Sequence, residues 1–296
     1  MQFLEILKVV LLGIIEGITE WLPVSSTGHI LLFDEVFSLH ISSGNDAERA
    51  QAFMEAFKVV IQLGAILAVV ILFWKKLFPF TLEKNEQKNG KIKLNADMGI
   101  LNLWGKVIIA CIPAAVLGLL FDDFLEAHLQ TPLVISLTLI LYGVAFIVIE
   151  NQNKTRDLPI KSSHDITYKQ AFIIGMFQVL SLIPGTSRSG ATIIGALLIG
   201  VARPAGAEFT FYLAIPVMVG ASAIKILKFV LDYGFFTASE FGYIIIAMAV
   251  AFAVSMLAIK FLMDFVKKHD FKPFGWYRII LGAIVIATLV LPPMLG

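Results

Sequence analysis

Cysteine is almost absent from this sequence, in which Cys111 is the one cysteine among 296 residues. A single thiol cannot form an internal disulfide or a cysteine-based metal site, so both kinds of scaffold are excluded. Charge is scarce as well, because only 15% of the residues are charged, against roughly 25% in an average soluble domain. A water-soluble fold is therefore nearly excluded.

An excess of charge of one sign is also missing, since 23 basic and 22 acidic residues leave a formal net charge of +1. Proteins that bind nucleic acid through its phosphates usually carry a basic excess, so no nucleic-acid partner is expected. Hydrophobic residues, by contrast, make up 58% of the chain, and the mean hydropathy is +0.86. Membrane lipid must cover the apolar surface that the fold cannot bury.

Long apolar runs predict membrane-spanning helices, which need about 20 mostly apolar residues. Two apolar regions, 9–33 and 170–202, are interrupted by polar turns that begin at Pro23 and Pro184. Polar backbone is tolerated at membrane depth only inside protein or beside a wet cavity, so we predict two re-entrant helix pairs whose turns meet inside the protein. Six other runs can each be extended to a full span: 59–74, 98–121, 127–149, 209–224, 241–259 and 279–296.

The segments form two similar halves, in which residues 53–64 resemble 209–220. An odd number of spans in each half gives the halves opposite orientations, as in the inverted repeats of many transporters, with the functional site at the repeat interface. The predicted fold is an all-α integral membrane protein with one membrane domain, 1–296. Its first inverted repeat is 1–150 and its second is 165–296, each a re-entrant helix pair plus three transmembrane helices.

The charges of the connecting segments predict the orientation. Lysine and arginine gather in 75–106, 150–169 and 267–278, whereas 122–131 and 232–240 contain neither. Basic connections usually stay on the cytoplasmic side, so the first three are expected inside and the other two outside. The first re-entrant pair then enters from outside and the second from the cytoplasm.

Two carboxylates precede the first polar turn. Glu16 and Glu20 are four residues apart, which places both on one face of a helix. Carboxylates beside a polar turn suit a divalent cation such as Mg²⁺ or Ca²⁺, which prefers oxygen ligands and often bridges to phosphate. The alternative is a buried pair that shares a proton, or a pair that simply lines water.

The first turn itself supplies hydroxyl groups at Ser25, Ser26 and Thr27, with Gly28 and the imidazole of His29 beside them. Ser25 and Thr27 are candidate ligands of the substrate phosphate. Ser26 is a candidate nucleophile or phosphate ligand, and His29 is a candidate general acid or base. The plainer interpretation is that these hydroxyl groups cap a helix and that the histidine is structural.

The second turn surrounds a single basic residue, Arg188, the only one between Lys169 and Arg203. A guanidinium group matches phosphate oxygens, and the free amides of a new helix form an anion site. The alternative is that Arg188 balances Glu16 or Glu20 across the interface of the repeats. Candidate phosphate ligands in this turn are Gly185, Thr186, Ser187, Ser189, Gly190 and Thr192.

Residues 16–29 and 184–192 closely resemble the two signature motifs of the bacterial undecaprenyl-diphosphate phosphatase family, also called bacitracin-resistance proteins. The likeness extends to 60–69 and 112–118 and so covers nearly the whole chain. It implies an enzyme that hydrolyses undecaprenyl diphosphate to undecaprenyl phosphate and inorganic phosphate, depends on a divalent cation, and recycles the carrier lipid for wall synthesis. It also implies a multi-pass protein of the cytoplasmic membrane with a site open to the outer face.

The resemblance assigns Glu16 and Glu20 to the metal and water, Ser26 and His29 to the chemistry, and Arg188 to the diphosphate. We favour Ser26 as nucleophile with His29 as acid or base, and water activated by the metal is the close rival. A lipid flippase or transporter built on the same inverted repeat is the alternative function. The sequence leaves the oligomeric state open, a homodimer included.

Overall fold

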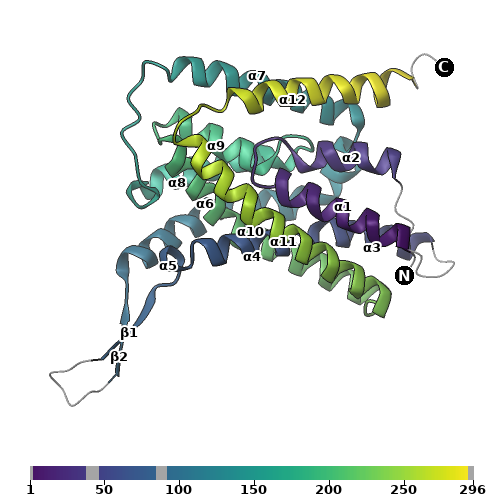
Figure 1. Ribbon diagram of the computed structural model, residues 1–296, viewed down its shortest axis with the longest axis horizontal. Coiled ribbons are helices and arrows are strands. Elements are labelled where there is room, and N and C mark those ends of the chain that lie inside the picture. Colours follow the sequence, from purple (N-terminus) through teal and green to yellow (C-terminus); the bar gives the residue numbers. More distant parts are fainter. Residues whose placement is uncertain (1–2, 38–46, 85–91, 293–296) are drawn as a thin grey trace.

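The structure is a computed structural model that describes residues 3–37, 47–84 and 92–292. These residues form helices and a single pair of strands (Figure 1). The first half contains α1 (Phe3–Thr19), α2 (Ser26–Val36), α3 (Ala47–Val60), α4 (Gln62–Leu72), α5 (Trp74–Leu77), β1 (Phe80–Lys84), β2 (Ile92–Ala96), α6 (Met98–Leu129) and α7 (Pro132–Gln152). The second half contains α8 (Tyr168–Val179), α9 (Arg188–Leu198), α10 (Arg203–Tyr233), α11 (Ala238–Val266) and α12 (Lys272–Val285), with short turns of 3₁₀-helix at Ser163–Asp165 and Leu180–Leu182 and a π-helical turn at Ile286–Val290.

Within the described residues, six helical segments are long and apolar enough to cross a membrane, which confirms the predicted number of spans. Most are longer than the uncharged runs, because charged side chains near their ends can extend to the membrane surface. The predicted span 209–224, for example, belongs to a helix of 31 residues, Arg203–Tyr233. The six spans are Ala47–Leu72, Met98–Phe121, Pro132–Gln152, Arg203–Tyr233, Ala238–Val266 and Lys272–Val290.

Local sequence signals explain where several helices begin. Thr167 and Thr237 each form a capping box with the residue three positions later, Gln170 and Glu240 respectively. In this arrangement side chain and backbone satisfy each other's free donors at the helix start. α7 begins with Pro132, whose fixed φ angle and missing N–H suit the first turn of a helix.

A hairpin of β1 and β2 follows α5. β1 pairs with β2 in antiparallel register, with Phe80 opposite Ala96 and Lys84 opposite Ile92. It projects from the helical body (Figure 1). The alternation of apolar and polar residues along both segments is typical of strands, and the many charged residues between them hid it.

Close helix packing positions the two polar turns. α1 lies along α11, and α12 lies along α7 (Figure 1). Glycine permits the close approach: a Cβ added at Gly17 would lie 2.8 Å from the carbonyl oxygen of Ala251. Beside it, the Ser255 hydroxyl donates to the Gly17 carbonyl at 3.2 Å. The end of α1, which carries Glu16 and directly precedes Glu20, is thereby fixed against α11.

Candidate active site

The two polar turns have the same local construction. α2 and α9 each begin after a serine cap, and the Oγ atoms of Ser25 and Ser187 accept from the backbone N–H groups of Gly28 and Gly190 at 3.4 and 3.3 Å. Both serines have positive φ angles, 73° and 65°. Such backbone strain in a residue other than glycine is concentrated at ligand sites. The predicted helix capping is therefore present, together with two free helix N-termini that could hold an anion.

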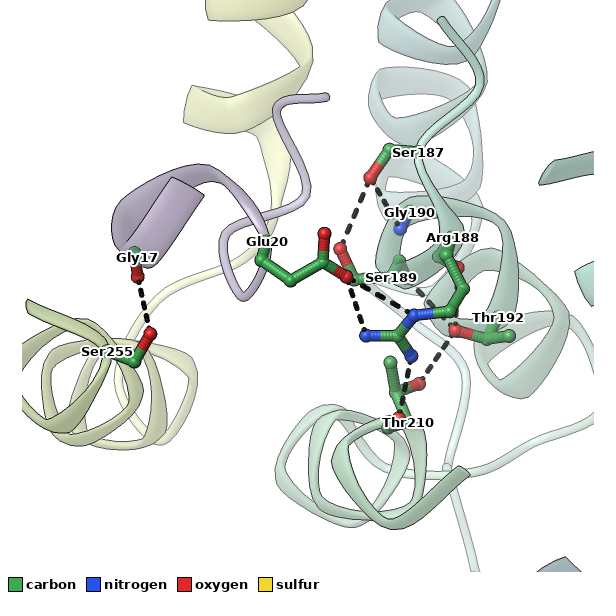
Figure 2. Close-up of polar contacts among 9 residues, drawn as sticks. All are labelled: Gly17, Glu20, Ser187, Arg188, Ser189, Gly190, Thr192, Thr210 and Ser255. Carbon is green, nitrogen blue, oxygen red and sulfur yellow. Dashed lines mark hydrogen bonds and ion pairs between the residues drawn. The ribbon is translucent and has the colours of Figure 1, made fainter. Parts of the chain in front are cut away.

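Arg188 pairs with Glu20 across these turns (Figure 2). Its Nη2 and Nε atoms donate to Oε1 of Glu20 at 3.0 and 3.4 Å, and its Nη1 donates to the carbonyl oxygen of Thr210 at 2.9 Å. Both side chains are largely buried. These contacts use three of the five N–H groups of the guanidinium, and one hydrogen remains on each Nη atom for a phosphate oxygen.

Hydroxyl groups line the start of α9 next to Arg188 (Figure 2). The Oγ atoms of Ser187 and Ser189 are 3.2 Å apart. The Thr192 hydroxyl donates to backbone carbonyls of its own helix and accepts from the Thr210 hydroxyl at 2.9 Å. Thr192 therefore joins α9 to α10, whereas Ser187 and Ser189 present their oxygens at the helix N-terminus.

Glu16 is fully buried, and among the described residues neither of its carboxylate oxygens has a hydrogen-bond partner. The side chains of Glu20 and Gln62 lie close to it. An unpaired buried carboxylate is costly unless a cation neutralises it, so this pair of carboxylates fits a divalent cation. The described residues contain no group of three or more His, Cys, Asp or Glu side chains that could hold a metal. Water or substrate would supply the remaining ligands, as is common for Mg²⁺.

Ser26 and His29 point to different partners. Ser26 lies close to the carboxylate of Glu20. His29 instead contacts the Ser25 carbonyl through Nδ1 and the Tyr277 hydroxyl through Nε2, both at 2.7 Å. Among the described residues no hydrogen bond joins Ser26 to His29, so the predicted pair of nucleophile and base is not preassembled.

Three other candidate residues of the two turns differ in their exposure and in their contacts. Thr27 is exposed, and its hydroxyl makes no hydrogen bond within the described part of the chain. Thr186 is buried, and its hydroxyl oxygen has no partner there. Gly185 has a φ angle of 86°, and a Cβ at this position would lie 2.2 Å from the Thr138 hydroxyl oxygen. Gly185 is thus required by the turn itself.

Arg278 is a residue of the site that the sequence did not indicate. The loop charges assigned it to a basic cytoplasmic segment, but it is fully buried. Its Nη1 donates to the Pro23 carbonyl at 3.3 Å, and its Nη2 donates to the carbonyls of Gly185 and Thr186, both at 2.9 Å. One side chain therefore holds both polar turns together. An available signal was the likeness of 276–280 to 104–108 in the other half.

Comparison with known proteins decides the family. The profile of bacitracin resistance protein BacA matches residues 9–284. The chain belongs to this family. It is 60% identical over 286 residues to the undecaprenyl-diphosphatase of Enterococcus faecalis, covering 97% of this chain and 98% of that protein. It is also 54% identical to the undecaprenyl-diphosphatase of Desulfitobacterium hafniense, with coverage of 97% and 96%. A third relative, the undecaprenyl-diphosphatase of Streptococcus mutans, is 49% identical, with coverage of 97% and 96%.

Proposed function

We propose that this protein is an undecaprenyl-diphosphatase, which hydrolyses undecaprenyl diphosphate to undecaprenyl phosphate and inorganic phosphate. The main support is the Glu20–Arg188 pair between the N-termini of α2 and α9, in a chain that matches undecaprenyl-diphosphatases over nearly its full length. Phosphoryl transfer needs chiefly positioned groups and neutralised charge, and both are available here. The product would return the carrier lipid to wall synthesis.

Phosphate release tests this function directly. Purified protein in detergent is expected to release inorganic phosphate from undecaprenyl diphosphate and to leave undecaprenyl phosphate. Phosphate would be measured colorimetrically and the lipid by chromatography. If the intact protein moved the lipid between vesicle leaflets but released no phosphate, the flippase function would replace the phosphatase.

In the proposed reaction, Arg188, Ser187, Ser189 and the free amides of α9 hold phosphate oxygens. Ser26 Oγ gives its proton to His29 and attacks the terminal phosphorus; the bond from that phosphorus to the bridging oxygen breaks, and undecaprenyl phosphate leaves with the bonding electrons and that proton. Water then attacks the phosphoserine and gives a proton to His29; the bond from phosphorus to Ser26 Oγ breaks, and Oγ takes this proton back as inorganic phosphate leaves. The proximity of Ser26 to Glu20 supports a role for this serine. Attack by water is the rival route, and in both routes we retain His29 as the proposed acid or base.

Glu16 and Glu20 are the proposed ligands of a divalent cation, Mg²⁺ or Ca²⁺, which would offset the charge of the diphosphate when bound. We expect a chelator to abolish phosphate release and either cation to restore it. Glu16→Gln should retain partial activity and need a higher cation concentration for half-maximal rate, because an amide keeps one oxygen ligand but loses the charge. Cation binding, measured by calorimetry without substrate, should weaken in the same variant. Unchanged cation affinity would contradict this assignment.

We further propose that the two halves are inverted repeats, and that α1–α2 and α8–α9 enter the membrane from opposite faces. The matching serine caps of α2 and α9 support this symmetry. The loop charges favour the cytoplasmic membrane of a bacterium with the α1–α2 side outward. The substrate would then approach from the outer face with its prenyl tail in lipid.

The two ends of α11 offer a matched test of this topology. Ser239 and Lys268 are both exposed and lie at opposite ends of the helix. In a Cys111→Ser background, Ser239→Cys should react with an impermeant thiol reagent added to intact cells. Lys268→Cys should react only after permeabilisation. The reverse labelling pattern would invert the proposed orientation.

A further inference from the structure

The contact between His29 and Tyr277 joins two elements that are far apart in the sequence. His29 lies in α2 and Tyr277 in α12. The Nε2 and Oη atoms are 2.7 Å apart, and the two rings are nearly parallel, with centroids 5.6 Å apart and an angle of 9° between their planes.

The other ring nitrogen decides which way these hydrogen bonds run. Nδ1 of His29 lies 2.7 Å from the Ser25 carbonyl oxygen, and a carbonyl oxygen can only accept. Nδ1 must therefore carry a proton. In the neutral ring Nε2 is then the acceptor, and the Tyr277 hydroxyl is the donor. The Ser25 carbonyl thus sets the tautomer of His29, and the Tyr277 hydroxyl holds the orientation of the ring through Nε2.

These two bonds also reach the strained start of α2. The Ser25 carbonyl that His29 holds belongs to the cap with a φ angle of 73°. The residue after Tyr277, Arg278, holds the same turn at Pro23. Consecutive residues of α12 therefore support this turn at two points, Arg278 directly and Tyr277 through His29.

We propose that Tyr277 is a positioning residue of the phosphatase reaction, which fixes the orientation of His29 through its hydroxyl group. This inference rests on the proposed function. Loss of the hydroxyl would leave the imidazole held only by the Ser25 carbonyl, so that the ring would spend less time in the orientation the reaction needs. Hydrogen-bond partners that orient functional histidines typically contribute about 10- to 100-fold to activity.

Tyr277→Phe tests the hydroxyl and leaves the stacked ring in place. We expect kcat for phosphate release to fall about 10- to 100-fold, while KM changes little. Tyr168→Phe is the matched control, because Tyr168 is 45% exposed against 46% for Tyr277, and its hydroxyl makes no hydrogen bond among the described residues. The control should keep the activity of the original protein.

A double-mutant cycle separates action through His29 from a general structural effect. In a His29→Ala background, adding Tyr277→Phe should lower kcat no further, because coupled residues are not additive. An equal fall in both backgrounds would overturn the proposal, as would a Tyr277→Phe protein as active as the Tyr168→Phe control.

Nitrogen-15 NMR of labelled histidines gives a readout that does not depend on turnover. The His29 signals, assigned by their loss in His29→Ala, should show the proton on Nδ1 in both proteins, whereas the signal of the unprotonated Nε2 should shift in Tyr277→Phe because this nitrogen loses its hydrogen-bond donor. Unchanged signals in Tyr277→Phe would refute the positioning role. Absence of phosphate release from the original protein would instead refute the proposed function, so the two failures are distinguishable.

Discussion

Replacement of Arg188 by lysine is expected to lower the turnover rate for undecaprenyl diphosphate on the order of 100-fold or more, the scale of losing one well-placed electrostatic donor in a dry site. Arg188 contacts Glu20 through two nitrogens and the Thr210 carbonyl through the third. An ammonium group cannot reproduce this planar arrangement and still offer hydrogens to phosphate. Turnover and melting temperature, measured together, separate a phosphate-binding role from a purely structural one.

Arg203 provides the matched control for this substitution. It forms an ion pair with the fully buried Glu150 and hydrogen bonds to both of its carboxylate oxygens. Arg203→Lys therefore disrupts a similar pair of arginine and carboxylate that lies away from the two polar turns. This variant should retain most of its turnover even if its melting temperature falls. An Arg188→Lys protein that kept its turnover would show that Arg188 serves only as the counter-ion of Glu20.

Much of the fold could be predicted because a membrane requires long apolar helices, and hydropathy reports these directly. The two polar turns were also predictable, since proline, glycine and serine cluster at 23–28 and 184–190 within apolar surroundings. Helix ends were less predictable, because the helices extend beyond the uncharged runs at positions such as Lys225 and Lys228. The hairpin was missed because polar residues dominate segment 81–97, and such a composition is also typical of a solvated loop.

The residues that form the site were easier to predict than the contacts between them. The sequence indicated Arg188 and Glu20 and left open whether they form an ion pair, which the structure contains. Arg278 and Tyr277 were missed because their partners are far away in the chain: the Pro23 carbonyl for Arg278 and the ring of His29 for Tyr277. Contacts of a side chain with a distant backbone carbonyl leave no spacing pattern in the sequence.

Replacement of Glu20 by glutamine is expected to have the largest effect of all. The amide keeps the shape of the side chain but removes the charge that Arg188 pairs with and one proposed ligand of the cation. Phosphate release should fall on the order of 1,000-fold or more, since both the cation and the orientation of Arg188 are lost together. Binding of radiolabelled undecaprenyl diphosphate should remain measurable, because the prenyl tail and the hydroxyl groups of α9 are untouched.

Glu150→Gln is the control that makes this result interpretable. Glu150 is also a buried carboxylate paired with an arginine, Arg203, and it additionally accepts from the backbone N–H of Phe271 at 3.0 Å. Removing a charge from either pair leaves an arginine without its partner and should lower the melting temperature. Only Glu20→Gln should abolish catalysis in protein that is still folded, because only Glu20 lies beside Ser26 and Glu16. Full phosphate release by Glu20→Gln would remove these carboxylates from the chemistry and return the flippase to consideration.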